Sequence, residues 1–104
     1  PVESMRLWGV ALAQHAIGDR VASEEALRSL TERFADTSAY QIAEVHAWRG
    51  ERDAAMEWLE RALRQRDAGI LMIPRSPWLA PLRGDPRFVS FVQKVGFAPE
   101  VARK

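Results

Sequence analysis

The chain has 104 residues, of which 47% are hydrophobic, and this length suits one small domain with a modest core. It contains no Cys, which excludes disulfides, Cys-ligated metals and thiol chemistry, and which fits a reducing cytoplasm. No apolar run approaches the roughly 20 residues that span a bilayer, and no signal peptide is visible. We therefore expect a cytoplasmic protein that does not enter membranes.

The net charge of +1 hides an uneven distribution along the chain. Residues 1–60 carry 6 basic and 11 acidic side chains, whereas residues 61–104 carry 9 and 3. The basic side chains are mostly isolated, and Tyr and Phe do not alternate with them as a stacking surface for bases requires. We interpret them as solvated helix faces. A nucleic-acid or small-ligand site on the basic half is left as a third alternative.

Apolar residues recur at spacings of three and four, which predicts helices, and the alternation typical of strands is nearly absent. The first predicted helix covers about Glu3–Ile17 and is apolar around most of its circumference, so it must pack on two sides. Gly18 ends it, because glycine readily adopts the left-handed conformation at a helix C-terminus. The second predicted helix covers about Arg20–Phe34.

Two further helices follow at similar spacing. One covers about Ser38–Arg49, where Ser38 and Gln41 stand at the positions of a capping box. The other covers about Asp53–Gln65, with Asp53 as its predicted N-cap.

The pattern then changes. Ala68–Ile73 is a short apolar stretch that Pro74 stops. The dipeptides Ser-Pro and Asp-Pro open two more helical segments, about Ser76–Leu82 and Asp85–Val95, because Ser or Asp caps a helix and Pro suits its first position. Residues 98–104 are expected to be frayed.

The chain matches itself at an offset of 32 residues. The corresponding pairs are Leu7 and Ala39, Val10 and Ile42, Ala11 and Ala43, Gly18 and Gly50, Ser23 and Ala55, Leu27 and Leu59, and Leu30 and Ala62. A fixed period of this size indicates stacked supersecondary units. Stacked helix pairs mostly present surfaces for other proteins and seldom carry chemistry.

The two helix pairs resemble tetratricopeptide repeats. The positions that carry this resemblance are Ala39, Ile42, Ala43 and His46 on the first helix of the second pair, and Ala55, Leu59 and Ala62 on the second. The chain departs from the family pattern where Gln14 and His46 replace aromatic residues, where Asp67 replaces Pro, and in its period of 32 rather than about 34. The small residues have a physical reason, because they let two helices approach closely.

The run Pro-Leu-Arg-Gly-Asp-Pro-Arg-Phe at residues 81–88 is similar to the closing segment of many bacterial repeat proteins. This resemblance implies that the chain is a fragment from the C-terminal part of a longer bacterial signalling or regulatory protein. A solenoid needs a cap on its last helix pair, and the tail supplies suitable apolar residues. No matching cap precedes Glu3, so the first pair is expected to meet upstream repeats or a second copy in a homodimer.

We therefore predict an all-α fold, an α-α superhelix of two helix pairs with a C-terminal helical cap. Residues 1–104 form a single domain. Its predicted parts are repeat one at 3–36, repeat two at 37–67, the cap at 68–97 and the frayed tail at 98–104.

Catalysis and metal binding are not indicated. There is no Gly-rich phosphate loop and no Gly-x-Ser-x-Gly elbow, and the carboxylates lie on regular helix faces. The two histidines, His15 and His46, have no further ligands at suitable spacing. We expect no enzyme activity, no metal and no cofactor.

The resemblance places the binding surface in a concave groove formed by the first helices of the repeats, which in that family holds an extended peptide or a partner helix. The residues at these positions are Met5, Trp8, Leu12, His15, Tyr40, Glu44 and Trp48. Aromatic anchors supply much of the binding energy at such surfaces. The predicted function is a non-catalytic protein–protein interaction module with a protein or peptide partner.

The alternative is a structural cap of a longer solenoid that mediates self-association without a peptide ligand. A peptide reader leaves Trp8 and Trp48 partly exposed in a groove, whereas a cap or dimer module buries them against its own tail or a second copy. The sequence leaves open whether the Ala68–Ile73 segment fills the groove.

Overall fold

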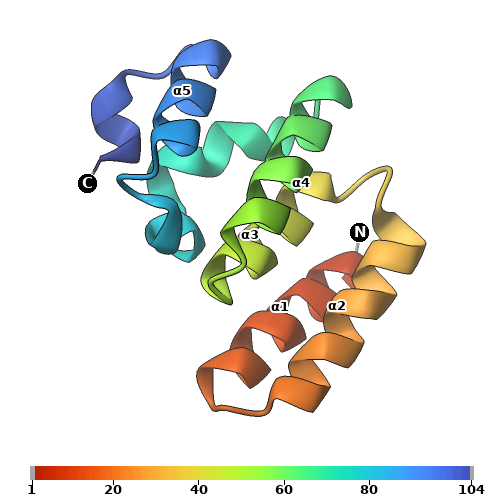
Figure 1. The fold of residues 1–104 in the computed structure, drawn as a ribbon. Helices are drawn as coiled ribbons and strands as arrows, with labels where there is room; N and C mark the ends of the chain where they lie inside the picture. The colour runs from red at the N-terminus through yellow and green to blue at the C-terminus, as the bar shows by residue number, and fades with distance from the viewer. Residues whose placement is uncertain (1, 104) are drawn as a thin grey trace.

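The structure is a computed structural model that describes residues 2–103, and in this range every regular element is a helix (Figure 1). The α-helices are α1 (Val2–Ala16), α2 (Arg20–Phe34), α3 (Ala39–Trp48), α4 (Arg52–Arg64) and α5 (Pro86–Val95). Three 3₁₀ helices lie in the C-terminal part: η1 (Ala68–Arg75), η2 (Pro77–Leu82) and η3 (Pro99–Ala102). The predicted all-α fold is confirmed, and α1 to α4 begin and end within one residue of the predicted bounds.

The helices form two pairs that follow the 32-residue repeat (Figure 1). α1 lies beside α2, and α3 lies beside α4. Gly18 and Gly50 make the turn within each pair, with φ of 88° and 82°. These values lie in the left-handed region that favours glycine, so the helix ends predicted from these two residues are confirmed.

Small residues bring the helices of each pair together. Ser23 and its repeat equivalent Ala55 are both fully buried. The Ser23 hydroxyl donates a hydrogen bond to the Ala11 carbonyl oxygen at 2.8 Å, which ties α2 to the backbone of α1. A larger side chain at either position would separate the two helices.

The core has two parts. The first lies between the helix pairs and joins Leu7, Leu12, Leu27 and Leu30 of α1 and α2 to Ile42 and Val45 of α3. The second joins α3 and α4 to the tail, through residues that include Leu59, Leu79, Leu82, Phe88 and Phe91. The tail therefore packs over the second helix pair, as a cap does, and buries its apolar side.

The tail is more ordered than the sequence indicates. Residues 98–104 were expected to be frayed, and this expectation is wrong for Pro99–Ala102, which form η3 beside α5. Ala102 is fully buried, and its carbonyl oxygen accepts a hydrogen bond from the Gly84 amide at 2.9 Å. Likewise, the Ala68–Ile73 stretch does not end at Pro74, because η1 continues to Arg75.

Two predicted caps are also corrected. The Ser38 side chain makes no capping hydrogen bond, so the capping box does not form. The N-cap of α4 is Glu51 rather than Asp53. The Asp53 carboxylate, in the first turn of α4, pairs with Arg87 of α5 at 2.7 Å.

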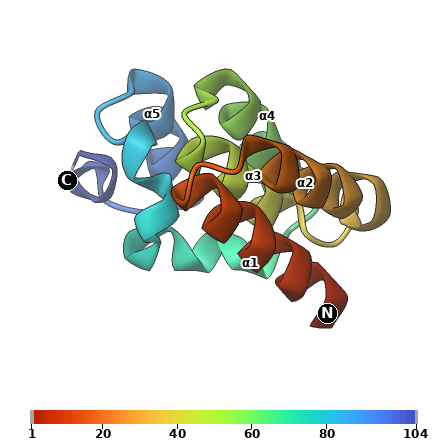
Figure 2. The same ribbon diagram turned by 90° about the horizontal axis from the view of Figure 1, so that it is seen from below.

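The turquoise η1–η2 segment positions the site described next (Figure 2). It runs below α3 in this view, on the side where α1 lies. Within residues 2–103, no helix has both the length and the apolar character needed to cross a membrane.

Candidate functional site

A groove of about 830 Å³ opens between α1, α3 and the η1–η2 segment, and we call it the α1–α3 groove. Its walls include Met5 and Trp8 from α1, Tyr40 and Glu44 from α3, and Met72 and Trp78 from the tail. The helical period explains the first four: Met5 and Trp8 stand three residues apart on one stripe, as Tyr40 and Glu44 stand four apart on the other helix.

Four of the seven predicted groove residues thus line one cavity: Met5, Trp8, Tyr40 and Glu44. Leu12, His15 and Trp48 do not. Leu12 is 4% exposed and lies in the core between the helix pairs. His15 is half-buried and lies about two helical turns beyond Trp8, the last α1 residue in the groove lining.

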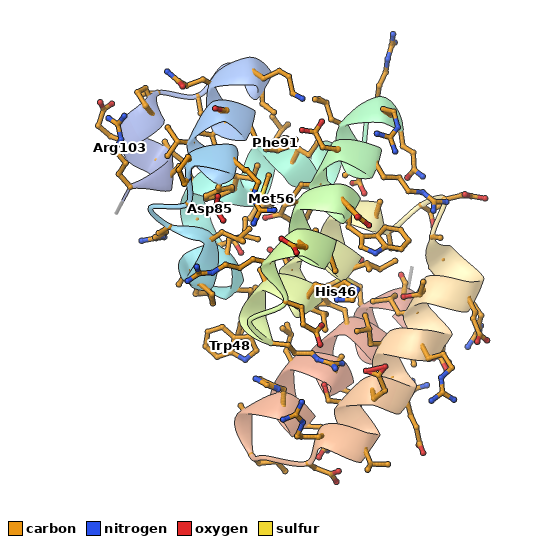
Figure 3. The ribbon with its side chains drawn as sticks, viewed as in Figure 1. His46, Trp48, Met56, Asp85, Phe91 and Arg103 are labelled. Atoms are coloured by element: carbon orange, nitrogen blue, oxygen red, sulfur yellow. The ribbon has the colours of Figure 1, made fainter. Side chains whose placement is uncertain are left out.

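Trp48 lies outside the groove lining and packs against the tail. It lies at the C-terminal end of α3, on the side of η2 (Figure 3). The Trp78 ring packs against it edge to face, with 5.2 Å between ring centroids and an interplanar angle of 89°. Trp78 also packs edge to face against Trp8 at 6.2 Å. Trp8 and Trp78 line the groove, whereas Trp48 lies outside the groove lining and packs against Trp78.

The Ala68–Ile73 segment forms a wall of the groove and does not fill it. The sequence had left this question open. Gly69 and Met72 line the cavity, whereas Ile70 and Ile73 point into the core and are 4% and 3% exposed. The alternation follows from the 3₁₀ helix, whose residues three apart share a face. Ser76 and Trp78 were not predicted as site residues, and no local signal marks them.

Glu44 is the polar centre of the groove. Its side chain is buried, and each carboxylate oxygen accepts one hydrogen bond: Oε1 from Trp8 Nε1 at 3.0 Å, and Oε2 from the Ser76 hydroxyl at 2.7 Å. Glu44 therefore joins α1, α3 and the tail. No Lys or Arg among residues 2–103 forms an ion pair with it.

Burial raises the pKa of Glu44 above its ordinary value, and the nearby charge of Asp67 acts in the same direction. The hydroxyl groups of Ser76 and Tyr40 and the indole N–H of Trp8 oppose this shift without cancelling it. Burial also raises the pKa of Tyr40, whose hydroxyl lies beside Glu44 and Ser76. That hydroxyl is fully enclosed and makes no well-formed hydrogen bond within the described part of the chain.

Other buried polar groups gather at the same place. Of the five buried serines and charged residues in the described range, four line the α1–α3 groove: Ser4, Ser38, Glu44 and Ser76. The fifth, Ser23, serves the contact between α1 and α2. Burying a polar group is costly unless it is hydrogen-bonded, so their convergence marks the groove as a specialised surface.

Asp67 holds one wall of the groove in place. Its carboxylate accepts hydrogen bonds from the Tyr40 amide at 3.0 Å and from the Gly69 amide at 2.8 Å, which fixes the start of η1 against the start of α3. The backbone at Gly69 then lies directly on the Tyr40 ring. A Cβ added at Gly69 would stand 2.6 Å from Tyr40 Cδ2.

The rim of the groove carries charges of both signs. Arg33 lines it and pairs with Glu3 at 3.1 Å, and Arg75 is exposed at its edge. The second histidine, His46, lies outside the groove with its Nδ1 2.8 Å from Glu51. Within residues 2–103, no group of three or more His, Asp and Glu side chains is arranged to hold a metal ion.

The raised pKa of Glu44 predicts how the stability of the fold depends on pH. The folded state holds the Glu44 proton more tightly than the unfolded chain does. Its stabilising contribution is therefore complete below the unfolded value of 4.5 and is lost as the pH rises through the folded value. We expect Glu44→Gln, which stays neutral, to be more stable than the wild type at pH 7, with a difference that disappears near pH 4.

Urea unfolding at several pH values measures this difference. The variant must be compared with the wild type at each pH, because other acidic groups affect the stability in the opposite direction. Glu3 is one of them, since its pairing with Arg6 and Arg33 lowers its pKa to about 2. Glu57→Gln is the matched control, since Glu57 is exposed on α4. A Glu44→Gln protein less stable than the wild type at pH 7 would contradict the prediction.

Comparison of the chain with family models, with curated proteins and with solved structures found no match in any of the three. The resemblance to tetratricopeptide repeats therefore stays a prediction, based on the residues quoted for it.

Proposed function

We propose that the α1–α3 groove binds an extended segment of a partner protein, and that the chain is a non-catalytic protein-interaction module. The observation that carries this proposal is one cavity of about 830 Å³ that has apolar walls and is lined by four of the five buried serine and charged residues in the described range. Binding sites are typically concave and mostly apolar, with a few polar groups that orient the ligand. On the basis of the resemblance, we also propose that the module is the C-terminal part of a cytoplasmic bacterial signalling or regulatory protein.

The walls suit a peptide. Met5 of α1 and Met72 of η1 both line the groove and are 49% and 50% exposed. Methionine is flexible and polarizable, so it adapts to the side chains of a ligand. Trp8 lines the same groove and offers a half-buried aromatic surface, of the kind that anchors partners at interfaces.

A structural cap that mediates self-association is the second candidate. The observation that favours it is the edge-to-face packing of Trp78 against Trp48 and Trp8. Through this packing the tail covers Trp48, which a longer groove would leave open. Exposed apolar residues on the first pair, Ile17 at 75% and Val21 at 69%, offer a surface for a second copy.

A random dodecapeptide library displayed on phage, selected on the immobilised protein, tests the first candidate. Selected peptides are then synthesised, and their affinities are measured by fluorescence anisotropy. We expect the double variant Met5→Ser/Met72→Ser to weaken binding at least tenfold, because both side chains line the groove.

The matched control is Ile17→Ser/Leu71→Ser, which removes two apolar side chains that are 75% and 70% exposed and lie outside the groove lining. It should leave the affinity within twofold of the wild type, and circular dichroism verifies the folding of both variants. Equal losses in the two variants, or a library that yields no binder, would contradict the peptide-groove proposal. A concentration-dependent dimer without any peptide binder would favour the self-association candidate.

A further inference from the structure

The buried carboxylate of Glu44 is an unpaired charge on the floor of a groove. It is 4% exposed, and no Lys or Arg within residues 2–103 is paired with it. Buried ionised groups in proteins are normally paired or bound to a metal, because the loss of hydration is expensive. The hydrogen bonds from Trp8 and Ser76 supply only neutral donors. A cation that reaches Glu44 from the groove would supply the missing partner.

The surroundings of Glu44 suit an organic cation in particular. Trp8 and Trp78, both half-buried, line the same groove, and the Trp8 indole is held against the carboxylate by its own N–H donor. Aromatic faces attract ammonium and guanidinium groups, most strongly where water is excluded. The apolar walls can also cover the aliphatic stem of a Lys or Arg side chain, which packs well on apolar surface.

We propose that Glu44 recognises a basic side chain, Lys or Arg, of the peptide that the α1–α3 groove binds. The basic group sits against Glu44 beside the Trp8 and Trp78 rings, and its stem lies along the methionine-lined walls. This inference rests on the proposed function and adds the chemistry of the ligand to it.

The rim charges define the ligand further. Asp67 also lines the groove, where its carboxylate accepts hydrogen bonds from the Tyr40 and Gly69 amides, so its charge adds to the attraction of the groove for a basic group. Arg75 is exposed at the edge of the groove and repels additional positive charge, whereas the charge of Arg33 is paired with Glu3. The groove therefore selects a single basic residue with non-basic neighbours, and it disfavours a run of basic residues.

Three random heptapeptide libraries test this proposal. Their central residue is Lys, Arg or Gln, and their other positions exclude basic residues. The fraction of each library retained by the immobilised protein is measured. We expect the wild type to retain the Lys and Arg libraries at least tenfold better than the Gln library.

Glu44→Gln is expected to remove this preference, because it keeps the shape of the side chain and loses the charge. Glu57→Gln, an exposed acid on α4, should retain the preference in full. Equal retention of all three libraries by the wild type, or a preference that persists in Glu44→Gln, would overturn the inference.

The same experiment separates the two proposals. If all three libraries bind equally and Met5→Ser/Met72→Ser abolishes their binding, the peptide groove stands and the basic anchor is wrong. If none of the libraries binds, the peptide groove itself is wrong, and the basic anchor with it.

Discussion

Replacing Trp48 with alanine is expected to lower the free energy of unfolding by about 3 kcal/mol, the lower end of the range for removing a large aromatic side chain from a core. The reason is its packing against Trp78, at 5.2 Å between ring centroids, which is one of the contacts that hold η2 on α3. It is only half-buried, so a part of its surface faces water in both states. Urea or thermal unfolding measures the loss.

Trp48→Phe is the matched control for this variant. It keeps an aromatic ring against Trp78 and removes the indole N–H, which is enclosed and makes no hydrogen bond in the described range. We expect it to cost less than about 1.5 kcal/mol, as a near-conservative change in core volume does. A Trp48→Ala protein with unchanged stability but lost peptide binding would show that Trp48 is a groove residue after all.

Replacing Gly69 with alanine is expected to destabilise the protein by about 2 kcal/mol and to weaken binding in the α1–α3 groove. The new Cβ would lie 2.6 Å from Tyr40 Cδ2, 2.9 Å from Cγ and 3.0 Å from Cβ. These atoms are the base of a ring that is 2% exposed, so neither the ring nor η1 can yield without repacking, which typically costs 1–3 kcal/mol. Displacement of Tyr40 also reshapes the groove floor.

Gly9→Ala provides the control with the opposite sign. Gly9 lies within α1, and a Cβ added there meets nothing within 4 Å. Alanine in a helix interior is more favourable than glycine by about 0.5–1 kcal/mol, so this variant should gain stability. Parallel unfolding curves test both glycines. Similar effects of the two substitutions would refute the close packing of η1 on Tyr40.

The different positions of Trp8 and Trp48 bear on the two candidate functions. On the repeat pattern alone the two residues were equivalent candidates for the groove. In the structure Trp8 lines an open cavity, whereas Trp48 lies against the tail. The protein thus combines a cap over the end of α3 with a groove beside Glu44, and the peptide groove that we propose is shorter than the one expected from seven residues.

The backbone structure of α1 to α4 could be predicted from the amino-acid sequence without coordinates. Helix formation depends on neighbours within about four residues, so apolar spacing and the turns at Gly18 and Gly50 were enough to predict the bounds of α1 to α4. The 32-residue repeat also indicated that these helices form two pairs. The apolar spacing is local and the repeat is periodic, so both can be recognised in the sequence alone.

The site was decided by tertiary structure. Glu44 receives its hydrogen bonds from Trp8 and Ser76, which lie 36 and 32 residues away along the chain. The tail has no repeat equivalent, so no pattern predicts that Trp78 covers Trp48 or that Met72 forms a wall of the groove. Such contacts depend on how the tail folds back over α3, because a side chain's partners are set by the packing of whole elements and not by the spacing of residues within one.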